Sequence, residues 1–387
     1  MIVRTFIECN TCFKSITLRV QLGHRDFEEF KFLCPFCNEN LSIGLYLDQK
    51  NLKYEIKAML NCKKTVNEGE TGKEIYLSSE IITSNEIIKS DFPFPSIYLG
   101  HKLHTGKINK YLVIETSIKR WDFLKRAFDQ KQQKNFELEE ILLQNYRNEN
   151  NLKKDAFFKN CLFHFCGTHF NDKKYKQIEN VFKFIEIYYK TSKSEVINLR
   201  NYLRSQFNVN ISFIMETIQE IYSNIELHIP IINFLLTELY NKDELYYSLN
   251  DFNKIKQTYG NIYEKLSELV VVFAGLFNIS ENRSFGTFKN MNLKTYESID
   301  KANKLNPFKG ISEFMIFCIE YDSYLRNSSH HGHIHFDKNY NEILYYTEKQ
   351  ENTKNMSLKD YLIKTNIIFI NMLAVLSIWL FIIIIED

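Results

Sequence analysis

Apolar and polar positions alternate near the N-terminus of this chain, and they recur every three or four residues along most of the remainder. Alternation with a period of two predicts short strands over 2–7, 16–22, 30–33 and 41–47. Strand-like signal continues from about Tyr54 through 75–81 and 93–114. We therefore expect a β-rich region that extends to about residue 115.

Beyond that point the spacing is that of amphipathic helices. It predicts helical segments over 120–150, 153–190, 194–207, 210–224 and 229–241, and then over 251–279 and 310–331. Gly332 follows the last of these, where glycine commonly ends a helix. Alternation returns over 332–346 and predicts a β-hairpin, and a final helix begins at Ser357, which can cap it. The expected fold class is α+β.

Composition limits the classes of partner and compartment. The chain has 387 residues, of which 44% are hydrophobic, so it can bury a substantial core. Its 49 basic and 47 acidic residues give a net charge of +2, so binding to nucleic acid would have to be local. The N-terminus lacks the features of a signal peptide, which favours the cytoplasm. Eight cysteines are then better explained as metal ligands and buried thiols than as disulfides.

Four of these cysteines form two Cys-x-x-Cys pairs, Cys9 with Cys12 and Cys34 with Cys37, separated by a strand-rich insert. This spacing is typical of a zinc ribbon, in which four thiolates close a tetrahedral site and leave no position for substrate. It predicts one structural Zn²⁺ per chain. The alternative is four unrelated buried thiols. Such a ribbon can bind nucleic acid, bind protein or only stabilise the fold.

A second cluster consists of Cys161, His164, Cys166 and His169. The surrounding pattern is helical, and these spacings do not place all four side chains on one helix face. Buried thiols and polar histidines are therefore preferred to a second metal site.

The last helix is ambiguous, because 367–385 is interrupted only by Asn371 and Ser377. Nineteen such residues can span a membrane, and the chain would then carry a tail anchor. A helix buried between a core and a dimer partner is also apolar on all sides. We favour the buried helix and a cytoplasmic protein.

The segment that carries candidate chemistry is Leu325-Arg326-Asn327-Ser328-Ser329-His330-His331-Gly332, at a predicted helix end. Metal-independent RNA cleavage needs a proton acceptor, a proton donor and a cation for the charged phosphorane. Histidine titrates near neutrality, and arginine presents a fork of donors that fits a phosphate. The C-terminal end of a helix also favours a charged histidine.

This segment resembles the HEPN superfamily, whose signature is an arginine, usually a polar residue such as asparagine, a few variable residues and a histidine. Arg326, Asn327 and His331 occupy these positions. The resemblance covers roughly 210–387 and implies a helical bundle with a β-hairpin insert. It further implies a homodimeric endoribonuclease that leaves a 2′,3′-cyclic phosphate and acts as a toxin-like or antiviral defence effector. Catalysis would need no cofactor, and Asn327 would orient the histidine or the phosphate.

The expected organisation is therefore a zinc ribbon at 1–50, a β-rich extension at 51–115, a helical middle region at 116–209 and a HEPN-like helical domain at 210–387. The partners implied are RNA, a second copy of the chain and a regulatory partner or trigger.

Several histidines crowd the motif and leave alternatives open. On an ideal helix His330 shares the face of Arg326, whereas His331 lies to one side. We favour His331 as catalytic and assign His330 and His333 to RNA binding. His331, His333 and His335 could instead hold a cation, or the histidines could be ordinary surface residues. In one branch of the family the residue two positions after the histidine is a tyrosine that is nucleotidylated, and here it is His333. The rival functions are a non-catalytic RNA- or protein-binding module and a membrane-anchored effector.

Overall fold

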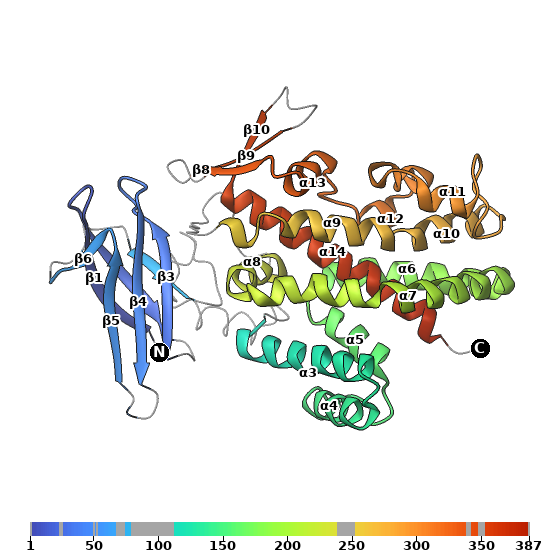
Figure 1. Cartoon of the computed structure of the whole chain (residues 1–387), viewed down its shortest axis with the longest axis horizontal. Coiled ribbons are helices and arrows are strands. Elements are labelled where there is room, and N and C mark those ends of the chain that lie inside the picture. The colour runs from blue at the N-terminus through green and yellow to red at the C-terminus, as the bar shows by residue number, and fades with distance from the viewer. Residues whose placement is uncertain are drawn as a thin grey trace.

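The computed structural model describes residues 2–22, 26–48, 51, 53–66, 74–78, 112–237, 252–337, 342–346 and 353–385. The chain is α+β, with a β-rich N-terminal part and a mainly helical remainder, and each part has its own hydrophobic core (Figure 1). The predicted strand signal over 93–111 lies outside the described residues.

The N-terminal part contains β1 (Ile2–Cys9), β2 (Ser15–Gln21), β3 (Phe27–Leu33), β4 (Asn40–Asp48), β5 (Lys53–Leu60), β6 (Cys62–Lys64) and β7 (Glu74–Leu77). These strands form one sheet in the order β6-β1-β2-β7 and another in the order β3-β4-β5. The pair β1–β2 and the pair β3–β4 are antiparallel hairpins, whereas β7 runs parallel to β2. The four strands predicted before residue 48 are confirmed.

Alternation along these strands explains how the core forms. Ile16, Leu18 and Val20 of β2 are fully buried, as are Leu41, Ile43 and Leu45 of β4. Because alternate side chains of a strand point to opposite faces, each sheet turns one apolar face inward. Both faces contribute to a single cluster, so the two sheets share one core.

The helical part begins with α3 (Ile114–Gln132), α4 (Phe136–Glu149), α5 (Phe158–Gly167), α6 (Asp172–Thr191), α7 (Lys193–Ser223) and α8 (Ile225–Thr237). It continues with η2 (Phe252–Lys254), α9 (Thr258–Leu269), α10 (Val271–Ser280), α11 (Leu293–Ser298), η3 (Lys301–Asn303), η4 (Asn306–Phe308), α12 (Ser312–Met315) and α13 (Ser323–His330). The helices predicted over 194–207 and 210–224 are one continuous helix, α7. Residues 238–241, at the end of the helix predicted over 229–241, are not among those described.

The helix predicted over 251–279 is broken at Val270, between α9 and α10. The indole nitrogen of Trp379 donates to the carbonyl oxygen of Leu269 at 2.7 Å, so that carbonyl is satisfied from another helix. A local apolar repeat cannot reveal such a long-range partner, which is why the sequence predicted one helix.

The helix predicted over 310–331 is also wrong as a single element, because α12 and α13 are separate. Between them Glu320 has a φ of +64°, a left-handed conformation that no helix interior allows. The hydroxyl of Tyr259 fixes this bend by donating to the carbonyl oxygen of Glu320 at 2.5 Å. Asp322 then restarts the helix by accepting from the backbone N–H groups of Tyr324 and Leu325.

Three strands follow α13, namely β8 (Ile334–Asp337), β9 (Glu342–Tyr346) and β10 (Thr353–Ser357), and they pair antiparallel in the order β10-β9-β8. Residues 338–341, which would form the turn of the hairpin predicted over 332–346, are not among the described residues. Helix α14 (Leu358–Ile384) comes next. The backbone N–H of Asp360 donates to the Ser357 side chain at 3.0 Å, which confirms the predicted N-cap.

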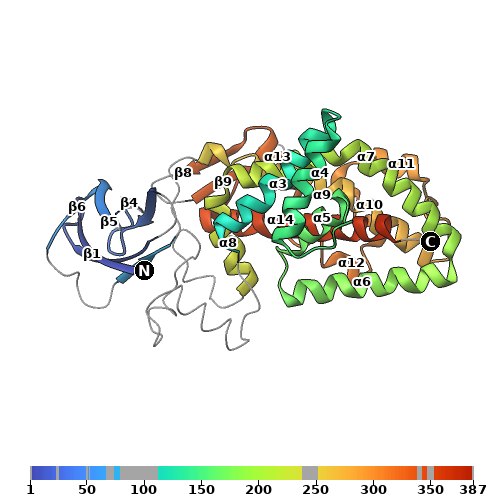
Figure 2. The same cartoon turned by 90° about the horizontal axis from the view of Figure 1, so that it is seen from below.

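Helix α14 runs through the helical part and packs against α5, α6, α7, α8 and α9 (Figures 1 and 2). It is long and apolar enough to cross a membrane, but 83% of its most apolar 18-residue stretch is buried inside the protein. Two of its polar side chains have partners on other helices: Asn366 contacts His228 at 3.2 Å, and Lys174 donates to Asn371 at 2.9 Å. These contacts fit the core helix of a soluble protein.

Candidate metal centre and candidate RNA-cleavage site

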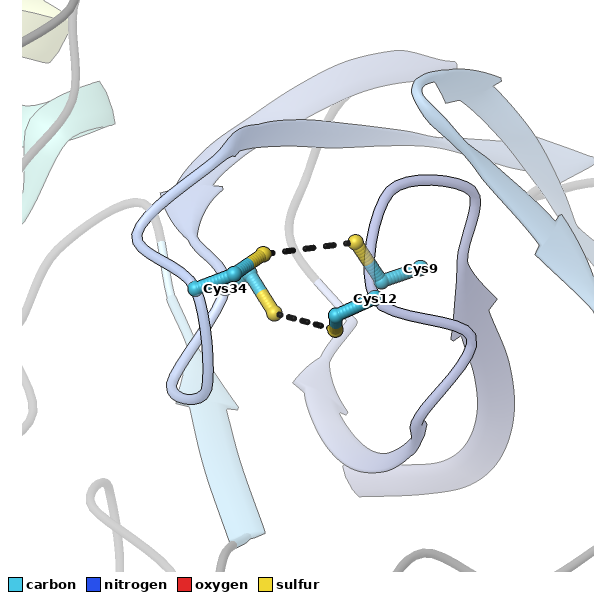
Figure 3. Close-up of side chains that lie close together, drawn as sticks. Cys9, Cys12 and Cys34 are labelled. Carbon is cyan, nitrogen blue, oxygen red and sulfur yellow. Dashed lines mark hydrogen bonds between the residues drawn. The ribbon is translucent and has the colours of Figure 1, made fainter.

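The two Cys-x-x-Cys pairs lie in the turns of two equivalent hairpins. Cys9 is the last residue of β1, and Cys34 directly follows β3. In both turns the residue four positions after the first cysteine, Phe13 or Asn38, has a left-handed φ near +60° and donates its N–H to that cysteine's carbonyl oxygen. The repeated turn geometry points all four sulfur atoms at one another (Figure 3).

The distances between sulfur atoms match a tetrahedral metal site. Cys9 Sγ lies 3.8 Å from Cys37 Sγ, Cys12 Sγ lies 3.7 Å from Cys34 Sγ, and all four atoms lie within 4.8 Å of one another. Four thiolates about 2.3 Å from one zinc ion would be spaced about 3.8 Å apart. The structure therefore brings together the four predicted ligands in a closed arrangement, which suits a structural metal.

The turns also supply donors to the sulfur atoms. Burial raises the pKa of Cys34 to about 12. The backbone N–H groups of Phe36 and Cys37 act in the opposite direction, because they favour the thiolate. Burial also acts to raise the pKa of Cys9, but backbone donors from Cys12 and Thr11 bring that pKa below its usual value. A bound cation would favour the thiolate form at all four positions.

A fifth cysteine lies beside this centre without belonging to it. Cys62 of β6 is the register partner of Cys9, and its thiol donates to the carbonyl oxygen of Ser42 at 3.3 Å. Burial raises its pKa, so it is a neutral structural thiol.

The motif predicted for RNA cleavage ends helix α13. His331 is the C-cap residue, and Gly332 has a φ of +74°, so glycine closes the helix as predicted. The backbone N–H of His333 donates to the carbonyl oxygen of Ser328 at 3.0 Å, which completes this closure. The end of α13 is thus fixed by its own backbone.

Two buried serines attach this helix end to its surroundings. The hydroxyl of Ser328 donates to the carbonyl oxygen of Tyr346 in β9 at 2.9 Å, and Ser329 donates to that of Lys256 at 2.6 Å. Asn327 and His331 remain exposed, while Arg326 and His330 are half-buried. No role was predicted for the two serines, because their partners are distant along the chain.

Arg326 is anchored by groups on two sides. Its Nε and Nη2 atoms contact Oε1 of Glu264 in α9, and its Nη1 donates to Oδ1 of Asn327 at 2.7 Å. The other carboxylate oxygen of Glu264 binds Lys301, which also lies 3.6 Å from Glu268. A guanidinium has five N–H donors, so these three contacts leave two donors for a ligand. Neither Glu264 nor Lys301 was predicted, since no local pattern links them to α13.

His330 packs inward, against α9. Its Nε2 atom is buried against the backbone of Gly260, where an added Cβ would come within 2.8 Å of that atom. Burial lowers the pKa of His330, and the nearby charges of Arg326, His331 and Lys301 also act to lower it. A hydrogen bond with the backbone of Gly260 acts in the opposite direction. The two histidines predicted to bind RNA, His330 and His333, therefore differ in their surroundings, because the ring of His330 packs against α9.

His333 lies beside His331, with ring centroids 6.4 Å apart, and its ring meets that of Tyr346 edge-on at 5.7 Å. His335 is exposed on β8. Within the described ranges, the four N-terminal cysteines alone form a group of three or more ligands close enough for one metal ion. The cation site considered for His331, His333 and His335 is not formed.

The second cysteine–histidine cluster is a set of structural residues, of which Cys161, Cys166 and His169 are buried and His164 is half-buried. His164 contacts the hydroxyl of Tyr146 at 2.9 Å, and His169 contacts that of Tyr222 at 3.1 Å. Cys161 and Cys166 are fully buried, and burial raises the pKa of both thiols. This agrees with the interpretation preferred from the sequence.

No family model, curated protein or solved structure matches this chain.

Proposed function

We propose that this protein is a metal-independent endoribonuclease of the HEPN type, in which Arg326 and His331 act on one scissile phosphate. The observation that supports this most strongly is the arrangement at the end of α13. A guanidinium anchored by Glu264 and Asn327 retains donors for a ligand, and an exposed histidine follows on the same fixed helix end. Fixed donors stabilise developing charge without reorganisation during the reaction.

The reaction would proceed by attack of the ribose 2′-hydroxyl. One imidazole removes the hydroxyl proton, and the 2′-oxygen bonds to phosphorus. The bond from phosphorus to the 5′-oxygen breaks as a second imidazole, in its protonated form, donates a proton to that oxygen. Arg326 would hold the non-bridging oxygens while negative charge accumulates. The products are a 2′,3′-cyclic phosphate and a free 5′-hydroxyl.

Two imidazoles are best supplied by two chains. Each chain has one matching motif, and the Nε2 atom of His330 is buried against α9. In a symmetric dimer, His331 of one chain would act as the base and the partner subunit's His331 as the acid. The proposed role is a toxin-like or antiviral effector, with the metal-binding N-terminal part receiving its trigger.

Cleavage of single-stranded RNA in EDTA by purified protein tests this function. Arg326→Ala and His331→Ala should each lower the rate by roughly 100-fold or more, the scale of losing an acid–base group or a charge-stabilising donor. His335→Ala is the matched control, because His335 is an exposed histidine on the adjoining strand. Cleavage that survives both motif variants contradicts the proposal, and RNA that is bound but never cut favours a non-catalytic binding module.

A further inference from the structure

Lys301 lies far from the motif in sequence but joins it in space. Its amino group binds Oε2 of Glu264, while Arg326 binds Oε1 of the same carboxylate. Two cations that share one carboxylate in this way can be no more than about 8 Å apart, given ordinary hydrogen-bond lengths. Burial lowers the pKa of Lys301, and the nearby charge of Arg326 lowers it further. Both groups are therefore close neighbours.

The backbone of Lys301 is held in place. Its carbonyl oxygen accepts from the hydroxyl of Tyr321 at 2.9 Å, and that ring stacks on Tyr263 of α9 with centroids 3.9 Å apart. Asp300 caps the short helix η3 that begins at Lys301. The lysine stem thus starts from a fixed point beside α9, and 31% of the side chain is exposed.

We propose that Lys301 is a second phosphate-binding cation of the RNA site, placed beside Arg326 by their shared contact with Glu264. This inference rests on the proposed function and names a residue that the motif does not contain. Arg326, Lys301 and Lys265 carry three positive charges against two on Glu264 and Glu268, so the ion-pair network keeps an excess of positive charge. An RNA phosphate can approach the exposed side of both cations while the carboxylate holds them from within.

The alternative is that Lys301 only neutralises Glu264 and Glu268. Lys265 makes a matched control, because it also binds Glu268, at 2.8 Å, yet its amino group lies over the ring of Phe213. Its side chain is 15% exposed. A lysine with a purely structural ion pair should behave as Lys265 does.

The test measures binding of a labelled single-stranded RNA to His331→Ala protein over a series of NaCl concentrations. Each phosphate contact contributes about 0.7 to the slope of log K against log salt for single strands. Adding Lys301→Gln should reduce the slope by about 0.7, Lys301→Arg should restore it, and Lys265→Gln should leave it unchanged. Thermal unfolding of each variant shows that the fold is retained.

An unchanged slope for Lys301→Gln, or an equal fall for Lys265→Gln, overturns the role of Lys301 and leaves the nuclease proposal standing. Cleavage by the His331→Ala protein at the wild-type rate overturns the nuclease proposal, whatever the slopes show. Wild-type protein that fails to bind RNA at low salt overturns both.

Discussion

Glu264 of α9 holds the guanidinium of Arg326 of α13, which lies 62 residues further along the chain. Both side chains are largely shielded from solvent, with exposed fractions of 17% and 25%. The carboxylate fixes one edge of the guanidinium, so the direction of its remaining donors depends on α9. The proposed site is therefore a property of two helices and not of the motif alone.

Glu264→Gln should lower kcat/KM for RNA cleavage by roughly 10- to 100-fold, because loss of the charged anchor allows Arg326 to move from its productive position. The overall fold should remain, since glutamine retains the shape and can still accept a hydrogen bond. Steady-state kinetics on folded variants measures the effect.

Glu268→Gln is the control for this prediction. Glu268 lies in the same ion-pair network but contacts Lys265 and Lys301 and is 36% exposed. Its loss should change kcat/KM by no more than about threefold, as for other partly exposed ion pairs. Equal losses in the two variants would show that the network is generally structural.

The four-cysteine centre predicts one metal ion per chain. Elemental analysis of purified protein should find about one zinc per chain, and Cys34→Ser should abolish it, because a closed site needs all four thiolates. The β-rich part should lose structure with the metal, while the helical core, which is a separate cluster, keeps its far-ultraviolet signal.

Cys62→Ser tests whether the metal site is specific. Cys62 pairs with Cys9 across two strands, and a serine hydroxyl can replace its hydrogen bond to Ser42. This variant should keep its zinc. Loss of metal from Cys62→Ser, or full retention by Cys34→Ser, would refute the assignment of ligands.

His228 should make the protein sensitive to acid. It is fully buried, and burial lowers its pKa to about 4, although a hydrogen bond with Asn366 acts to raise that pKa. The unfolded chain binds a proton below about pH 6.5 whereas the folded chain does not, so stability falls with pH between about 6.5 and 4. Between about pH 7 and pH 5 this costs about 2 kcal/mol.

The free energy of unfolding in urea at these two pH values measures this effect. His228→Gln cannot be protonated, so its stability should fall by about 2 kcal/mol less than that of the wild type over the same interval. If both proteins lose the same amount, another group is responsible.

Asn371 distinguishes a core helix from a membrane span. It accepts a hydrogen bond from Lys174, whose pKa is lowered to about 8 by burial, and it donates to the carbonyl oxygen of Ile319. Asn371→Leu should destabilise the protein by about 1–3 kcal/mol by leaving buried polar groups unpaired. Ser377→Ala, which removes a bond within α14, should cost less. A gain in stability from Asn371→Leu would favour the membrane helix.

The sequence predicted the features that depend on short-range chemistry. The cysteine spacing located the metal centre, Gly332 marked the end of α13, and Ser357 marked the start of α14, because each acts on neighbouring residues. Period-two alternation likewise identified the early strands.

Features set by distant contacts were missed for a physical reason. Trp379 satisfies the carbonyl of Leu269 at one helix break, and Tyr259 stabilises the bend at Glu320. Glu264 reaches Arg326 only after α9 and α13 have packed. An apolar repeat records which residues are buried, but it does not record which polar groups meet.

The chemical nature of the RNA ends tests the central proposal most directly. RNA cut by the purified protein in EDTA should carry 2′,3′-cyclic phosphate and 5′-hydroxyl ends, and a single 2′-deoxy nucleotide at the cut position should prevent cleavage there. Ends with a 3′-hydroxyl and a 5′-phosphate, or efficient cleavage at the 2′-deoxy position, would contradict a mechanism based on Arg326 and His331.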